Sequence, residues 1–211
     1  MSEKQKDKKL FVSTILLVIL HLAGFIGLHT SYRELFLQLT PFNLLVSALL
    51  LFLNQKDTNW SFYIFCFITF SFGYFIEVLG VKTGFIFGPY VYGNMLGFRL
   101  AGVPLVIGLN WLMLVYSVGI ICNRLKTNLF LKSIAGAGML VALDLFIEPV
   151  AIKYNFWRWE NVIPVQNYIA WFITSLLMLF IFYRASFEKN NPMANALYIV
   201  QLVFFILLGN F

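Results

Sequence analysis

Two acidic residues, Asp144 and Glu148, lie four positions apart within a long apolar run of the sequence. In a helix, residues with this spacing share one face, with their Cβ atoms about 6 Å apart. Two carboxyl groups this close in a medium of low dielectric constant do not both ionise easily, so one is expected to be protonated and the other charged near neutral pH. The pair could therefore supply an acid and a base in one place.

A third acidic residue, Glu77, lies in another apolar run, whereas the remaining six of the nine acids fall in tails or connections. An acidic residue at the centre of a membrane-spanning helix costs about 2.5–3.5 kcal/mol at insertion, so such residues are rare unless they are paired or functional. A structural role is the alternative, because carboxylates can also neutralise basic residues of nearby loops or join helices by hydrogen bonds. The candidate catalytic residues are Glu77, Asp144 and Glu148.

The composition places these acids in a membrane protein. Of the 211 residues, 61% are apolar and 11% are charged, whereas soluble domains have about 45–50% and about 25%. This excludes a soluble enzyme, and the 24 Phe, 10 Tyr and 5 Trp exclude a disordered chain. The net charge of +6 is scattered between apolar runs and forms no basic stripe, so no nucleic acid is expected as a partner.

Seven apolar runs have close to the roughly 20 residues that a helix needs to cross a bilayer. They are residues 10–28, 35–53, 60–79, 103–122, 131–150, 168–185 and 193–210. We therefore predict an all-α, polytopic integral membrane helical bundle of about seven transmembrane helices, which forms a single transmembrane domain over residues 1–211. The first run is long for a signal peptide and no small-residue cleavage site follows it, so we expect it to be retained.

Lysines and arginines predict the orientation, because cytoplasmic loops carry more of them. Ten lie in the segments on the side of the N-terminus and five on the other side, which predicts an N-in, C-out multi-pass protein of the cytoplasmic membrane. Residues 1–9 then form a basic cytoplasmic tail, and two long connections, 80–102 and 151–167, lie on the outer side. The three candidate acids share this outer depth.

Both long connections carry aromatic residues close to the acids, namely Tyr90, Tyr92, Trp157 and Trp159. They could line a pocket or belong to the aromatic belt of a membrane interface. Asn110 and Trp111 lie in the predicted fourth helix, where the amide could orient a carboxylate or bind a backbone carbonyl. These residues are candidates for substrate binding.

Several motifs are missing from the sequence. Its two histidines are too few for a di-iron hydroxylase, and no lysine lies in a helix core to hold retinal. The nucleotide-binding, phosphate-loop and zinc-protease motifs do not occur, and Cys66 and Cys122 have no metal-ligand spacing. We therefore expect neither a metal nor a cofactor, which leaves chemistry that needs only acids, water and an apolar pocket.

Two blocks of sequence resemble the carotenoid biosynthesis membrane family of CruF-type carotenoid 1,2-hydratases, which includes bisanhydrobacterioruberin hydratases. The first block runs from Gly73 through Glu77 and the Tyr90-Val-Tyr92 segment to Asn110-Trp111. The second begins at Asp144, continues through Glu148-Pro149, where the family often has Asp-Pro, and includes Trp157-Arg-Trp159, Asn167 and Trp171. Together they cover about half of the chain.

The resemblance implies the addition of water across the terminal C1=C2 double bond of an acyclic carotenoid end-group, which gives a tertiary alcohol. Protonation of C2 leaves the more stable tertiary cation at C1, which water captures. Asp144 and Glu148 would be the acid/base pair, with Glu77 supporting them or exchanging roles. The substrate-binding residues would be Tyr90, Tyr92, Asn110, Trp111, Trp157, Trp159 and Asn167.

The expected partner is a polyene dissolved in membrane lipid, such as lycopene, a γ-carotene-type molecule or a C50 precursor, and other carotenoid enzymes are candidate partners. Three alternatives stay open. A non-catalytic carotenoid- or lipid-binding protein would share the pocket, and an end-group cyclase would also protonate an alkene but must exclude water. A proton-coupled transporter would distribute its carboxylates across the membrane depth, which the shared depth of these acids disfavours.

Overall fold

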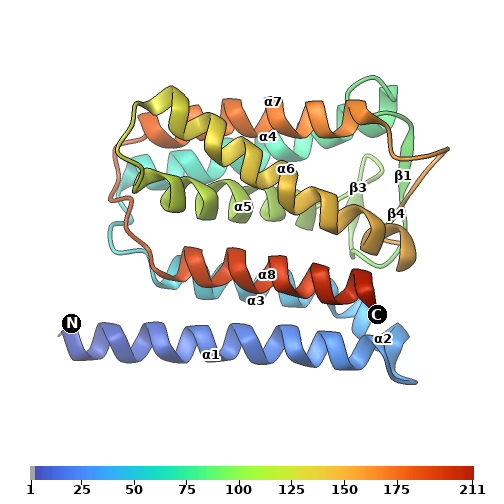
Figure 1. Ribbon diagram of the computed structural model, residues 1–211, viewed down its shortest axis with the longest axis horizontal. Helices are drawn as coiled ribbons and strands as arrows, with labels where there is room; N and C mark the ends of the chain where they lie inside the picture. The colour runs from blue at the N-terminus through green and yellow to red at the C-terminus, as the bar shows by residue number, and fades with distance from the viewer. Residues whose placement is uncertain (1–2) are drawn as a thin grey trace.

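The computed structural model describes residues 3–211, which form eight helices and four short strands (Figure 1). The helices are α1 (Glu3–Leu28), α2 (Arg33–Gln38), α3 (Thr40–Leu53), α4 (Trp60–Thr83), α5 (Val106–Asn123), α6 (Leu129–Lys153), α7 (Val165–Arg184) and α8 (Met193–Asn210). The strands are β1 (Tyr90–Tyr92), β2 (Arg99–Leu100), β3 (Val103–Pro104) and β4 (Trp157–Trp159). The predicted all-α class is confirmed.

Six of the helices, α1 and α4 to α8, are long and apolar enough to cross a membrane. The predicted helix 35–53 is instead divided into α2 and α3, because Pro41 lacks the N–H that would bond to the carbonyl of Leu37 in a continuous helix. The 14 residues of α3 span about 21 Å, less than the ~30 Å of a bilayer core. The structure therefore has six full-length spans and one short apolar helix where seven spans were predicted.

The long helices and α3 run back and forth between two ends of the molecule, so that the N- and C-termini lie at opposite ends (Figure 1). This agrees with an odd number of passes, while the N-in, C-out orientation stays a prediction. Residues 3–9 of the predicted basic tail form the first turns of α1, and residues 1–2 of that tail lie outside the described residues.

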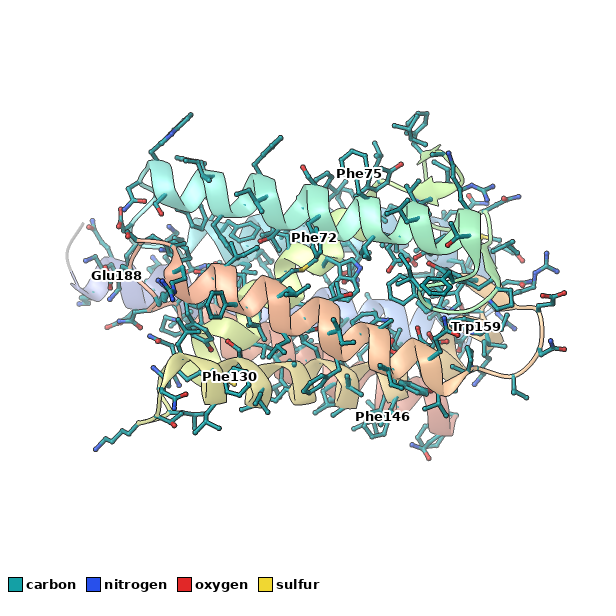
Figure 2. The ribbon with its side chains drawn as sticks, turned by 90° about the horizontal axis from the view of Figure 1, so that it is seen from above. Phe72, Phe75, Phe130, Phe146, Trp159 and Glu188 are labelled. Carbon is teal, nitrogen blue, oxygen red and sulfur yellow. The ribbon has the colours of Figure 1, made fainter. Side chains whose placement is uncertain are left out.

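The central helix of the bundle is α5, which packs against α3, α4, α6, α7 and α8. The first helix, α1, lies at the edge of the bundle against α3 and α8 (Figure 1). Large apolar side chains such as Phe75, Phe130 and Phe146 lie on the outer surface (Figure 2). Such an apolar perimeter around a buried core is expected of helices whose solvent is lipid.

The two long connections meet at the end of the bundle opposite the N-terminus, where β1 pairs with β4 in an antiparallel ribbon. Tyr90 is opposite Trp159, and Tyr92 is opposite Trp157. Because side chains alternate along a strand, these four rings share one face of the ribbon, while Val91 is exposed on the other. The ribbon thus covers the end of the bundle with aromatic side chains.

Candidate active site

Glu77 lies one and a half turns before the end of α4, where it is buried and accepts hydrogen bonds from three aromatic side chains. The Tyr90 and Tyr92 hydroxyls both donate to its Oε2, the latter at 2.7 Å, and the Trp111 indole N–H donates to its Oε1 at 2.9 Å. The donors come from β1 and α5. Their convergence on both oxygens suits an ionised carboxylate.

The approach of α5 to α4 depends on Gly73, one helical turn before Glu77. A Cβ atom at this position would lie 2.6 Å from the Cβ of Trp111, a distance that packed atoms do not reach. The missing side chain therefore lets the Trp111 indole reach the Glu77 carboxylate. The other face of the Trp111 ring is stacked on Trp171 of α7, with ring centroids 4.2 Å apart.

Asp144 and Glu148 lie on one face of α6, as their spacing predicts, and both are buried. The Glu148 Oε2 accepts hydrogen bonds from the indole N–H groups of Trp157 at 3.1 Å and Trp159 at 2.7 Å. Asn167, in the first turn of α7, joins the two acids, because its Nδ2 donates to Asp144 Oδ2 at 2.9 Å and to Glu148 Oε1 at 3.3 Å.

The surroundings of the three acids differ. Glu77 and Glu148 each accept three hydrogen bonds, whereas Asp144 accepts one, from Asn167, and its fully buried Oδ1 has no partner in the part of the chain that the structure describes. A buried polar atom without a partner costs free energy and calls for an explanation. Asp144 is thus the acid with the least support for a negative charge from its neighbours.

A cavity of about 40 Å³ lies between these groups. Because a water molecule needs roughly 10–15 Å³ of such volume, the cavity has room for a small number of waters and for no larger molecule. Its walls are Glu77, Phe87, Tyr90, Tyr92, Ile107, Asn110, Trp111, Ile147, Glu148, Trp157, Trp159, Asn167 and Trp171. Asp144 is not among them and reaches the cavity only through Asn167 and Glu148.

In the described part of the chain, no lysine or arginine lines this cavity. Arg99, a basic residue of the nearby 80–102 connection, donates to the backbone carbonyl of Tyr92 at 3.0 Å and to Asn94 and makes no ion pair with the acids among residues 3–211. Burial, followed by the negative charge of Glu77, raises the pKa of the Tyr90 and Tyr92 hydroxyls well above the usual range. Both hydroxyls are therefore held as proton-bearing donors.

The structure brings together all of the sequence-predicted residues. The three acids belong to one cluster, and every predicted substrate-binding residue lines the cavity: Tyr90, Tyr92, Asn110, Trp111, Trp157, Trp159 and Asn167. Sequence reasoning missed Phe87, Ile107, Ile147 and Trp171 as cavity residues. The position of Trp171, four residues after Asn167 and hence on the same face of α7, was the signal that could have found it.

Residues 39–211 match the family model described as "Carotenoid biosynthesis protein". A bisanhydrobacterioruberin hydratase from Haloarcula japonica is 32% identical over 126 residues, which are 53% of this chain and 41% of that relative. The aligned region thus spans less than half the length of this curated protein. No solved structure matches.

The matched residues include α3 to α8 and both strands of the aromatic ribbon. Every side chain that bonds to Glu77, Asp144 or Glu148 therefore comes from the region that carries the family match. The chain belongs to the family of carotenoid biosynthesis proteins.

Proposed function

We propose that the protein is a carotenoid hydratase, which adds water across the terminal C1=C2 double bond of an acyclic end-group to form a tertiary alcohol. The family of the chain and the hydratase named as its relative support this reaction class. The observation that carries the proposal is the water-sized cavity, which is walled by two carboxylates and four indole rings. A hydratase needs an acid, a bound water and faces that stabilise a cation.

In the proposed mechanism one of the two acids Asp144 and Glu148 carries a proton, because two carboxyl groups this close do not both ionise easily. Glu148 delivers it to C2, because Glu148 lines the cavity and Asp144 does not. Asp144 is a positioning residue that acts through Asn167 and Glu148. The π electrons of the double bond form the new C2–H bond and leave a positive charge on C1.

The cation at C1 would lie among aromatic rings, whose negatively polarised faces attract positive charge. Water in the cavity adds to C1, and the oxonium proton that results passes to Glu77, whose ionised form is supported by three donors. Transfer of this proton back to the pair through water restores the starting state. The sum is one alkene and one water converted into one alcohol, without oxidation or reduction.

The polarity of the cavity also supports hydration over cyclisation. A cyclase protonates a similar alkene but must keep water from the cation, and it would be expected to fill this space with apolar side chains. Here carboxylate, phenol, indole and amide groups surround a space of the size of a few water molecules. This supports hydration as the outcome.

The polyene chain needs a separate place, because the cavity is too small for it. An apolar groove of about 400 Å³ lies between α4 and α7, lined by residues such as Phe72, Ile76, Ile169 and Ile173. Figure 2 shows the two helices side by side, with Phe72 between them and Trp159 at the end of the bundle. The groove ends at Phe85 and Ile86, directly before the cavity residue Phe87.

The side chain of Gln166 closes the end of this groove, because its Nε2 donates to the backbone carbonyls of Phe85 and Ile86. We propose that an end-group enters from lipid along the groove and displaces this contact. Asn167 and Trp171 of the cavity neighbour the groove residues Gln166 and Ala170 in sequence, so a short movement of the 85–86 segment would connect the two spaces.

The experiment is expression of the full chain in a bacterium that accumulates lycopene, followed by mass analysis of the extracted pigments. We expect a gain of one water per acyclic end-group, with the heavy isotope in the new hydroxyl when cells grow in oxygen-labelled water. An unchanged mass with a changed retention time would indicate cyclisation instead. Unchanged pigments, with the protein present in the membrane and acyclic end-groups available, would refute catalysis on this substrate class.

A further inference from the structure

A second cavity, of about 220 Å³, lies between α1, α3 and α8, away from the three acids. Most of its lining is apolar and includes Leu28, Phe36, Phe204, Phe205 and Leu208. An apolar cavity of about 150 Å³ is large enough for benzene, so this one could hold a larger apolar group. Neither the family match nor the proposed reaction assigns a role to it.

Four polar side chains interrupt the apolar lining, namely His21, Thr40, Asn43 and Gln201, and the hydroxyl of Thr40 already donates to the backbone carbonyl of Phe36. Gln201 is only 4% exposed, and its Oε1 has no hydrogen-bond donor among residues 3–211. An unsatisfied polar group inside a membrane protein costs on the order of 1–3 kcal/mol or more, because lipid cannot replace the missing donor. A ligand that donates a hydrogen bond would remove this cost.

Asn43 and His21 add a hydrogen-bond donor and an acceptor to the lining of this cavity. The Asn43 Oδ1 already accepts from the Ser47 hydroxyl at 3.1 Å, and its Nδ2 lies 4.0 Å from the place that a Cβ on Gly24 would occupy. The amide group of Asn43 therefore presents a donor to the space beside Gly24. The Nδ1 of His21 lies 2.9 Å from the carbonyl of Leu17, so in the neutral ring Nε2 is an acceptor.

We propose that this second cavity binds the hydroxyl-bearing end of an apolar alcohol of isoprenoid type. The hydroxyl group would accept from Asn43 Nδ2 and donate to Gln201 Oε1 after a rotation of the Gln201 amide brings this buried oxygen to the cavity surface, while the hydrocarbon part would contact the phenylalanines and leucines. An alcohol matches this set because it is both a donor and an acceptor. We infer the isoprenoid chain of the ligand from the carotenoid biosynthesis family to which the protein belongs. We infer its hydroxyl group from the polar side chains that line the cavity.

Gly24 provides the space for such a ligand. A Cβ atom here would have only ordinary contacts, at 3.6 Å from the Phe204 ring, so the backbone does not require glycine and a larger side chain would extend into the cavity. Gly24, His21 and the other α1 residues of the lining precede residue 39, where the family match begins. One wall of the cavity therefore comes from a part of this chain that the family match does not include.

The test measures binding and requires no turnover, so its result is independent of the proposed hydration. The full chain in detergent is titrated by calorimetry with linalool, a branched tertiary alcohol, and with myrcene, the corresponding hydrocarbon. We expect linalool to bind about tenfold more tightly than myrcene, as expected for a buried hydrogen bond. Gln201→Leu should remove this preference while myrcene still binds, and Gly24→Leu should abolish the binding of both.

Gly138→Leu is the matched control, because a Cβ at this exposed glycine would meet nothing within 4 Å. It should bind both compounds as the unmodified protein does. Equal affinity for linalool and myrcene would overturn the role of the hydroxyl group. The absence of saturable binding, or binding that survives Gly24→Leu, would overturn the site itself. If Gly24→Leu does not fold, the loss of linalool preference in Gln201→Leu decides the question.

Discussion

Two clusters of buried polar side chains lie at opposite ends of the bundle, and they differ in composition. The carboxylate cluster consists of Glu77, Asp144, Glu148 and their donors beside the aromatic ribbon. The amide cluster, at the other end, consists of Gln55, Tyr116 and Asn191. Both are surrounded by aromatic rings and lie at the boundary between helices and loops.

Every polar side-chain atom of the amide cluster has a partner. The Tyr116 hydroxyl donates to Gln55 Oε1, and Asn191 Nδ2 donates to the Tyr116 oxygen at 3.0 Å and to a backbone carbonyl of α3 at 2.9 Å. The remaining amide groups bond to the backbone of the 55–57 and 188–193 segments. This cluster joins chain segments and leaves no group free.

The carboxylate cluster contains three acids, a cavity of the size of a few waters and one buried oxygen that has no partner among the described residues 3–211. Neutral amides would satisfy a structural role at lower cost than buried acids. The comparison therefore separates a cluster whose groups all serve to join chain segments from the cluster to which we assign the proposed chemistry. Substitutions in the two clusters should affect different measurements.

The largest expected effect is that of Glu148→Gln on hydration. The glutamine keeps the size of the side chain but cannot deliver a proton to the cavity, so we expect the rate to fall by about a thousandfold, within the range for general acid–base groups. The measurement is hydrated pigment per amount of folded protein. Product formation within a factor of a few of the unmodified chain would contradict the role of Glu148.

Asp144→Asn should lower the rate by about a hundredfold, less than Glu148→Gln, because Asp144 acts through its neighbour. The unfolding temperature should stay the same or rise, since the substitution removes a buried acid with an unpartnered oxygen. The pH dependence of the rate should change shape, because the coupled pair becomes a single titrating group. A lower rate with an unchanged pH profile would indicate only a structural role.

Asn191→Leu tests the amide cluster. It removes three hydrogen bonds at a fully buried position, and we expect the free energy of unfolding to fall by about 2 kcal/mol. The rate per folded molecule should be unchanged. Asn190→Leu, at the exposed neighbouring position, should change stability by less than about 0.5 kcal/mol. A loss of catalysis by folded Asn191→Leu would break the distinction between the clusters.

Trp159→Phe has a smaller expected effect on catalysis. The phenyl ring keeps an aromatic face beside the cavity, but the N–H that donates to Glu148 at 2.7 Å is lost. We expect about a tenfold lower rate, equivalent to one hydrogen bond to a charged group. Trp60→Phe, an exposed tryptophan at the other end of α4, should leave the rate unchanged. Equal rates for the two variants would remove Trp159 from the proposed site.

The smallest effect concerns alkaline pH. Burial and Glu77 raise the pKa of Tyr90 and Tyr92 in the folded protein, whereas tyrosines of the unfolded chain titrate near 10. The free energy of unfolding should therefore fall as the pH rises above about 10, because the unfolded chain then releases protons that the folded protein retains. Thermal unfolding of Tyr92→Phe should show a weaker fall. The same slope in both proteins would contradict this account.

Much of the site could be predicted from the sequence, because the rarity of charge in an apolar chain singled out Glu77, Asp144 and Glu148. The spacing of Asp144 and Glu148 predicted a shared helix face, and the two long connections predicted the end of the bundle at which they lie. The division of 35–53 into two helices was not predicted, although Pro41 was a visible local signal for it. Trp171 was missed because its type alone does not distinguish it from other aromatic residues of an apolar helix, and only its spacing from Asn167 was a local signal.

The sequence by itself determined the class of the protein and singled out its three buried acids and most of the aromatic residues of the cavity, because hydropathy and helix periodicity are local properties. Only the tertiary structure decided that Glu148 faces the cavity while Asp144 lies behind it, and that Tyr90 and Tyr92 bond to Glu77. The pairing of β1 with β4 and the cavity beside Gln201 were also decided there. These features depend on contacts between segments distant in the chain, whose geometry follows from how seven apolar helices pack together.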